Sequence, residues 1–159
     1  MRRIVVFLTL CALVIPAAAL GLPRAVGDGT LAVRDLNGFF AVQANRGAIV
    51  GRCDKCTLRI EELREDTAID PRVFGANVAV DLDGDGDNDR FLVRDGRWKL
   101  IGGGAFLVRV SNATDVDISL VGRGRVSLRG TAGTYSVNGG DSLAVETELT
   151  TFQLRASTP

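Results

Sequence analysis

Nine residues in the middle of the chain carry its strongest chemical signal. The segment Asp81-Leu82-Asp83-Gly84-Asp85-Gly86-Asp87-Asn88-Asp89 places a carboxylate at every other position. Calcium takes about six to eight oxygen ligands, which such a loop can supply from carboxylates and a backbone carbonyl. The glycine at the sixth position permits the sharp bend that the loop needs. We therefore predict a structural calcium site formed by Asp81, Asp83, Asp85, Asp87 and Asp89.

The segment departs from the EF-hand pattern, which requires a glutamate at the twelfth position, because that position is Leu92 in an apolar run. It resembles instead the Asp-x-Asp-x-Asp-Gly-x-x-Asp loops between β-strands of FG-GAP and related repeats. That resemblance implies side-chain ligands at the first, third, fifth and ninth positions and a carbonyl ligand at Asp87. A single copy does not imply a propeller. The alternative is an acidic turn that faces solvent.

Cys53 and Cys56 are the second feature. They are the only cysteines that remain if the N-terminal segment with Cys11 is removed, and exported proteins reside where disulfides persist. We predict a disulfide between them. The alternative is a thioredoxin-like redox site, which needs a helix starting at the first cysteine, whereas residues 57–60 have a strand pattern. Zinc is not expected, because the chain has no histidine and no third cysteine remains once the segment with Cys11 is removed.

Four arginines are the third feature, because their spacing lets several of them project from one side of neighbouring strands. They are Arg109, Arg123, Arg125 and Arg129. Such a face could bind a polyanion, for example an anionic cell-surface polymer. The alternative is a solvated strand face on which arginine stems cover apolar neighbours. Aromatic residues do not alternate with these arginines, so we do not expect nucleic acid as a partner.

The absence of histidine removes the usual general base, and with it the Ser-His-Asp and Cys-His arrangements. Paired carboxylates, as in glycosidases, must face each other across a cleft, and the clustered aspartates are better explained as cation ligands. We therefore predict a non-enzymatic protein with a binding or surface-structural role. A secreted enzyme or a Cys-x-x-Cys redox protein is the alternative.

Short apolar runs separated by glycine, asparagine and aspartate must position these residues. With 46% hydrophobic residues, 19 glycines and 4 prolines among 159 residues, the chain can bury one core and make many tight turns. No long helical stripe follows residue 19, which predicts an all-β fold. Asn37-Gly38 and Asp95-Gly96 each predict a type I′ hairpin. The expected architecture is a single-domain antiparallel β-sandwich or barrel built from hairpins.

Two further patterns leave the architecture open. Ala32-Val33-Arg34-Asp35 resembles Leu92-Val93-Arg94-Asp95, which is consistent with an internal duplication. The spacing of glycines at 102–104, 122 and 130 also allows a short β-solenoid that turns at these positions.

The N-terminus has the parts of a signal peptide: Met1-Arg2-Arg3, an uncharged apolar run at 4–15 and Pro16-Ala17-Ala18-Ala19. We expect a signal peptide at 1–19, a lead segment at 20–29, a β-rich domain at 30–155 and a C-terminal tail at 156–159. This organisation predicts a secreted or extracytoplasmic protein. The alternative is a membrane anchor formed by residues 4–22 if they are not cleaved, and only that form is expected to contact a membrane.

As a whole, the chain resembles small exported β-rich bacterial proteins in which Gly-Asp-Gly-Thr opens the domain and Asn-Gly-Gly and Phe-Gln-Leu segments close it. Here these segments are residues 27–30, 138–140 and 152–154. The resemblance spans nearly the whole mature chain. It implies export and a single domain, without an activity.

Overall fold

The computed structural model describes residues 25–63, 72–82, 84, 86, 88–102 and 105–157, so the predicted signal peptide at 1–19 lies outside the described residues. Within them the chain forms strands and no helix, and every strand pair is antiparallel. The predicted all-β, antiparallel single domain is confirmed. The strands are β1 (Gly29–Glu62), β2 (Arg72–Val80), β3 (Arg90–Gly102), β4 (Phe106–Val137), β5 (Leu143–Ala144) and β6 (Thr150–Leu154).

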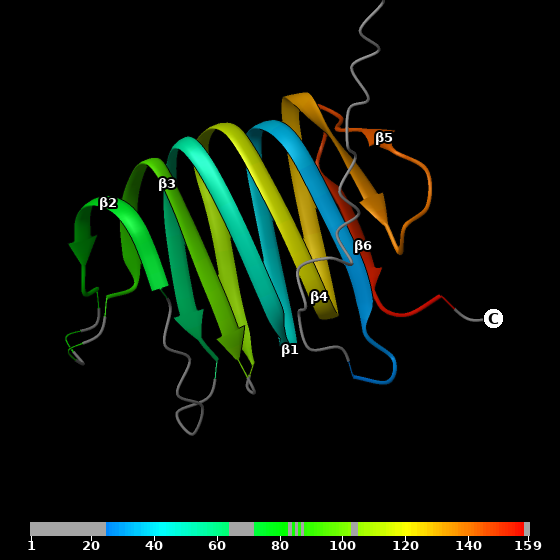
Figure 1. The fold of residues 1–159 in the computed structure, drawn as a ribbon, viewed down its shortest axis with the longest axis horizontal. Coiled ribbons are helices and arrows are strands. Elements are labelled where there is room, and N and C mark those ends of the chain that lie inside the picture. The colour runs from blue at the N-terminus through cyan, green and yellow to red at the C-terminus, as the bar shows by residue number, and fades with distance from the viewer. Residues whose placement is uncertain are drawn as a thin grey trace, which may run out of the picture.

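The two longest strands, β1 and β4, wind around a common axis. Phe40 of β1 pairs with Val110 on one edge and with Leu128 on the other, and these two residues of β4 are 18 positions apart. Each turn of the coil therefore takes about 18 residues of chain, and its neighbours on both sides are turns of the antiparallel partner. Figure 1 shows the result as a row of arches. The order β2-β3-β1-β4-β5, with β6 also on β4, is not closed into a barrel.

The limbs of the arches form two walls that enclose the core. One wall, called here the arginine wall, contains residues 38–44 and 56–62 of β1, 90–94 of β3 and 106–111 and 124–130 of β4. The opposite wall contains 29–34, 48–53, 96–101 and 116–121. Inward-facing side chains of both walls are buried in one cluster. Its largest members include Trp98, Phe40, Phe106, Ile49, Leu58, Leu120 and Leu128.

Residues with positive φ mark the bend at which a turn passes from one wall to the other. Asp35 (φ 52°), Asp95 (φ 46°) and Asp115 (φ 50°) lie at this bend, and aspartate tolerates the left-handed region better than most residues. Val33 and Leu36, on either side of Asp35, are both fully buried although they are three positions apart. One left-handed residue thus shifts the alternation, so that apolar side chains point inward on both walls.

Glycines occupy the other bend of the coil. Gly122 pairs with Gly29 on one edge and with Gly47 on the other, and Gly47 pairs in turn with Gly102. A Cβ atom at Gly47 would lie 2.6 Å from the carbonyl oxygen of Val121. Neighbouring turns therefore approach too closely at this bend for any side chain between them.

The two predicted hairpins are wrong, because both dipeptides lie inside continuous strands. A type I′ turn requires positive φ at both central residues. Asp95 has positive φ but Gly96 does not, and neither Asn37 nor Gly38 does. At Asp95 the chain bends and continues, since Cys53 pairs with Gly96 and Lys55 with Arg94.

The coil resembles the short β-solenoid that the glycine spacing allowed. Its two walls also face each other as in a sandwich, but the same strands, β1, β3 and β4, contribute to both of them. The similar segments that end in Asp35 and Asp95 occupy the same bend in different turns. Because each turn imposes the same demands on this bend, the coil is sufficient to account for the similarity without a duplicated half-domain.

We predict that Gly51→Ala destabilises the fold by about 1–3 kcal/mol through overpacking. A Cβ atom at Gly51 would lie 2.1 Å from the Trp98 ring, which is 1% exposed and cannot move into solvent. Chemical denaturation of Gly51→Ala, Trp98→Leu and the double variant measures this clash. Because Trp98→Leu removes the obstructing ring atoms, the double variant should be more stable than the sum of the two single effects. Simple additivity would contradict the packing described here.

Candidate anion-binding wall and cation loop

Three arginines lie side by side on the arginine wall. Arg59 of β1 pairs with Arg90 of β3 on one edge and with Arg109 of β4 on the other. Directly opposite residues of an antiparallel sheet project from the same face, and Leu58 and Ile60, the neighbours of Arg59, are buried. The arginines therefore point outward. With adjacent strands about 4.8 Å apart, they form a line across the strands that we call the arginine row.

The same wall carries two of the other predicted arginines. Arg109 is followed across the strands by Ala41 and then by Ser127. Arg125 and Arg129 lie two positions before and after Ser127, and residues two apart on a strand share a face. The intervening Val126 and Leu128 are fully buried. Arg125 and Arg129 thus join the face that carries the arginine row.

Glu61 is the counter-charge of the arginine row. Its Oε1 atom lies 2.7 Å from Nε of Arg59 and 2.8 Å from Nη1 of Arg109. These side chains are 26%, 45% and 43% exposed, respectively, and ion pairs of this kind add little to stability. Within the described residues, no other carboxylate forms an ion pair with the five arginines. Like charges on adjacent strands oppose folding, so the row is not a stabilising device.

Arg123, the fourth predicted arginine, lies at the glycine bend, opposite Arg46. Arg46 forms an ion pair with the buried Asp28 at 3.1 Å and donates a hydrogen bond to the carbonyl oxygen of Val26. These contacts hold the segment through which the chain enters the coil. Arg123 is therefore outside the arginine row.

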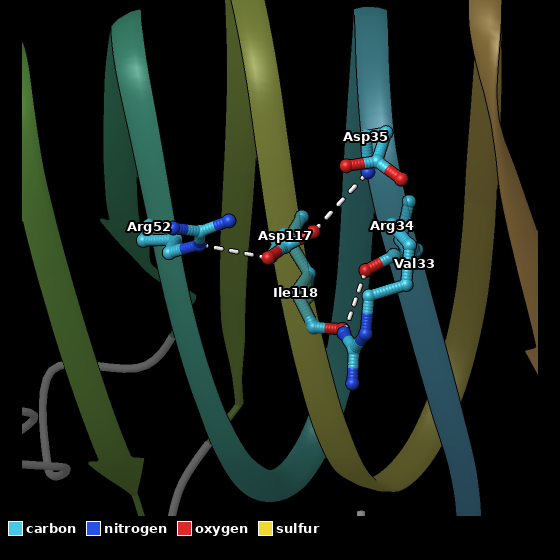
Figure 2. Close-up of polar contacts among 6 residues, drawn as sticks. All are labelled: Val33, Arg34, Asp35, Arg52, Asp117 and Ile118. Atoms are coloured by element: carbon cyan, nitrogen blue, oxygen red, sulfur yellow. Dashed lines mark hydrogen bonds and ion pairs between the residues drawn. The ribbon is translucent and has the colours of Figure 1, made fainter. Parts of the chain in front are cut away.

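Three charged groups on the opposite wall, Arg34, Arg52 and Asp117, form contacts between neighbouring turns (Figure 2). Asp117 accepts a hydrogen bond from Nε of Arg52 at 2.7 Å and one from the backbone N–H of Asp35 at 3.1 Å. The hydrogen bond and the charge of Asp117 raise the pKa of Arg52 above its ordinary value, although burial opposes this. Nη1 of Arg34 donates to the carbonyl oxygens of Val33 and Ile118. These contacts tie neighbouring turns together next to the bend at Asp35.

The predicted calcium loop connects β2 to β3 and is described in part. Asp83, Asp85 and Asp87 lie outside the described residues. The carboxylate of Asp81 accepts hydrogen bonds from the backbone N–H groups of Gly84 at 2.7 Å and Gly86 at 3.0 Å. The carboxylate of Asp89 accepts one from Leu82 at 2.8 Å. The first and last carboxylates are thus held on the inner side of a loop that curls around Asp81.

The base of this loop is joined to the arginine wall. The N–H group of Asp89 donates to the carbonyl oxygen of Val80, and the carbonyl oxygen of Asp89 accepts from Ile60 at 2.7 Å. The next residue, Arg90, is the first member of the arginine row. The loop therefore ends next to the arginine row.

The predicted disulfide between Cys53 and Cys56 is confirmed. Both residues are buried, at 2% and 3% exposure, and belong to the core cluster. Asp54 and Lys55 between them are exposed at the bend where β1 changes walls. The bridge therefore cross-links the two ends of one bend of the coil. A disulfide is also consistent with an oxidising, extracytoplasmic environment.

Sequence reasoning missed Arg59, Arg90 and Glu61. The alternation in Leu58-Arg59-Ile60 is enough to place Arg59 outward. Its position beside Arg90 and Arg109 depends on the register of three strands, which local sequence does not encode.

No family model, curated protein or solved structure matches the chain. Across the described ranges, no three acidic or cysteine side chains form a group able to hold a metal ion. In the same part of the chain, no helix has the length and apolar character needed to cross a membrane.

We predict that Cys53→Ala/Cys56→Ala lowers the free energy of unfolding by roughly 2 kcal/mol, the closure entropy of so short a loop. Thermal unfolding of the double variant against the oxidised protein measures this loss. Because both sulfur atoms are inside the coil, alkylation after mild reduction of the native protein should modify neither cysteine until the fold opens. Rapid alkylation with an unchanged midpoint would show that the bridge is not part of the core.

Proposed function

We propose that this chain is an exported, non-enzymatic binding protein whose arginine wall holds a linear polyanion, such as an anionic cell-surface polymer, and whose aspartate loop holds a structural calcium ion. The observation that carries the proposal is the arginine row. Three cations stand on adjacent strands, and one carboxylate, Glu61, pairs with two of them, Arg59 and Arg109. A bound anion would relieve the repulsion that the fold tolerates there.

The chemistry of the wall suits carboxylate, sulfate or phosphate groups on a chain. Arginine binds such groups through two parallel N–H donors and remains charged at all physiological pH values. The arginines are spread over several strands, so they fit an extended polymer better than a single small anion. Hydroxyl and amide side chains lie at outward positions on the same wall and can bond to uncharged polar groups of a polymer. They include Thr57, Ser111, Ser127, Gln43, Thr151 and Gln153.

The spacing of the aspartates and the hydrogen bonds at the two ends of the loop support a cation there. The hydrogen bonds to Asp81 and Asp89 hold the two end carboxylates in a closed loop, and oxygen donors are the ligands that calcium prefers. Asp81, Asp83, Asp85 and Asp89 would bind through side chains and Asp87 through its carbonyl oxygen. The ion would also neutralise carboxylates that stand immediately before Arg90, which leaves the arginine row free for an external anion.

We predict that Arg59→Gln/Arg109→Gln weakens binding of dextran sulfate by about tenfold, or about 1.4 kcal/mol. The two substitutions remove two of the three members of the arginine row and leave Glu61 without its two ion-pair partners. Titration calorimetry at two salt concentrations measures the affinity, which should fall as salt rises. Neutral dextran should not bind.

Two matched variants make this test specific. Arg97→Gln/Lys99→Gln removes the same amount of charge from the opposite wall and should change the affinity less than about twofold. Glu61→Gln removes the internal competitor and should strengthen binding. Equal losses from both walls would indicate a response to net charge alone and would contradict a polyanion site on the arginine wall.

We predict that calcium raises the unfolding midpoint by several degrees, because a ligand at about 100 times its dissociation constant stabilises the folded state by about 2.7 kcal/mol. Thermal unfolding with calcium and with a chelator gives the shift. Asp83→Ala/Asp85→Ala should abolish it, while Asp141→Ala, at the opposite end of the coil, should leave it intact. If the unfolding midpoint of the unaltered chain were the same with calcium and with a chelator, the loop would be a solvated turn and not a calcium site.

A further inference from the structure

The two ends of the coil differ in how their last strands are paired. At one end, β6 pairs with 124–128 of β4, β5 pairs with Thr134 and Tyr135, and the Tyr135 ring stacks on Phe152 with ring centroids 5.7 Å apart. At the other end, β2 pairs with β3 along one edge. Within the described residues, no strand pairs with its second edge. Figure 1 shows β2 as the terminal arch of the row.

The exposed edge of β2 has one feature that hinders strand pairing, two register shifts against β3 on either side of Ala76, and lacks most of the others. Natural edge strands are short, or carry lysine, proline or inward-pointing charges. β2 has nine residues, and after Arg72 none of them is charged or proline. Phe74 is 54% exposed and Val78 45%, and Leu92 beside Val78 on β3 is 44% exposed. Among the described residues, this end of the coil is therefore an apolar surface at which no strand pairs with the outer edge of β2.

We propose that β2 pairs with β2 of a second copy of this chain, antiparallel and about a two-fold axis, so that the sheet continues from one coil into the other. The unpaired backbone groups of an edge strand are complementary to another strand, and every pair in this sheet is antiparallel. A two-fold axis makes β2 antiparallel to its own copy and closes the assembly as a dimer.

The side chains of β2 match this occupant. β2 bends at Gly75, which has φ 77°. An axis at Ala76, next to the bend, would place Phe74 of one copy beside Val78 of the other, so that apolar groups meet apolar groups. No like charges oppose each other between Val73 and Val80. The alternative partner edge, β6, presents the exposed polar side chains of Thr151 and Gln153 near it, and pairing with it would build an open filament.

Sedimentation analysis over a concentration series tests the proposal on protein expressed from the complete sequence. The unaltered chain should form a dimer, and Val78→Lys should weaken it by about tenfold or more, since each dimer would contain two buried lysines. Leu149→Lys is the matched control, because Leu149 is 56% exposed at the opposite end. It should leave the dimer intact. Circular dichroism and thermal unfolding establish that both variants are folded.

Cross-linking locates the contact independently. In a chain whose Cys11 is replaced by serine, Asn77→Cys introduces one free thiol near the proposed axis, because Cys53 and Cys56 are bridged to each other. A short bifunctional thiol reagent should give a covalent dimer from Asn77→Cys and none from Leu149→Cys. A chain that stays monomeric at every concentration, one that grows without limit, or one that Leu149→Lys dissociates as strongly as Val78→Lys would overturn the proposal.

Discussion

The pairing of β1 with β4 along both edges is the interaction on which this structure depends. An isolated antiparallel pair leaves two edges unpaired and has little surface to bury. Here the first turn of β1 lies between two turns of β4, and its second turn lies between β4 and β3, so the backbone groups on its edges find partners within the same domain. The winding also brings the apolar faces of the two walls together. One arrangement therefore satisfies the backbone and encloses the core.

To wind, the chain must bend twice in each turn while its backbone hydrogen bonds to the neighbouring strands continue. Different residue types allow the two bends. At one bend a left-handed residue such as Asp35 or Asp95 shifts the alternation of side chains. At the other, glycines on adjacent strands let the turns approach closely. In a protein built from hairpins, polar and flexible residues of this kind form the turns between strands. Here they lie inside continuous strands.

The coil also explains how a binding surface can arise from distant segments. Outward residues at matching places in successive turns align across the strands, as Arg90, Arg59 and Arg109 do. Neighbouring strands of the wall are about 4.8 Å apart, so aligned side chains place their charges at regular intervals. Such spacing suits a linear polyanion. The aspartate loop meets this wall at Asp89 and Arg90, so cation binding and anion binding would take place at neighbouring residues.

The sequence by itself determined the local properties of this protein. Alternating apolar residues predicted strands, the cysteine spacing predicted the bridge between Cys53 and Cys56, and Asp95 was correctly expected to take positive φ. These properties depend on residues close together in the chain. Only the tertiary structure decided that the chain bends at Asp95 instead of reversing, because that depends on a partner strand bending at the same place. It likewise decided that Arg59 joins Arg90 and Arg109, since register between strands is set by core packing across the whole coil and not by the residues that it aligns.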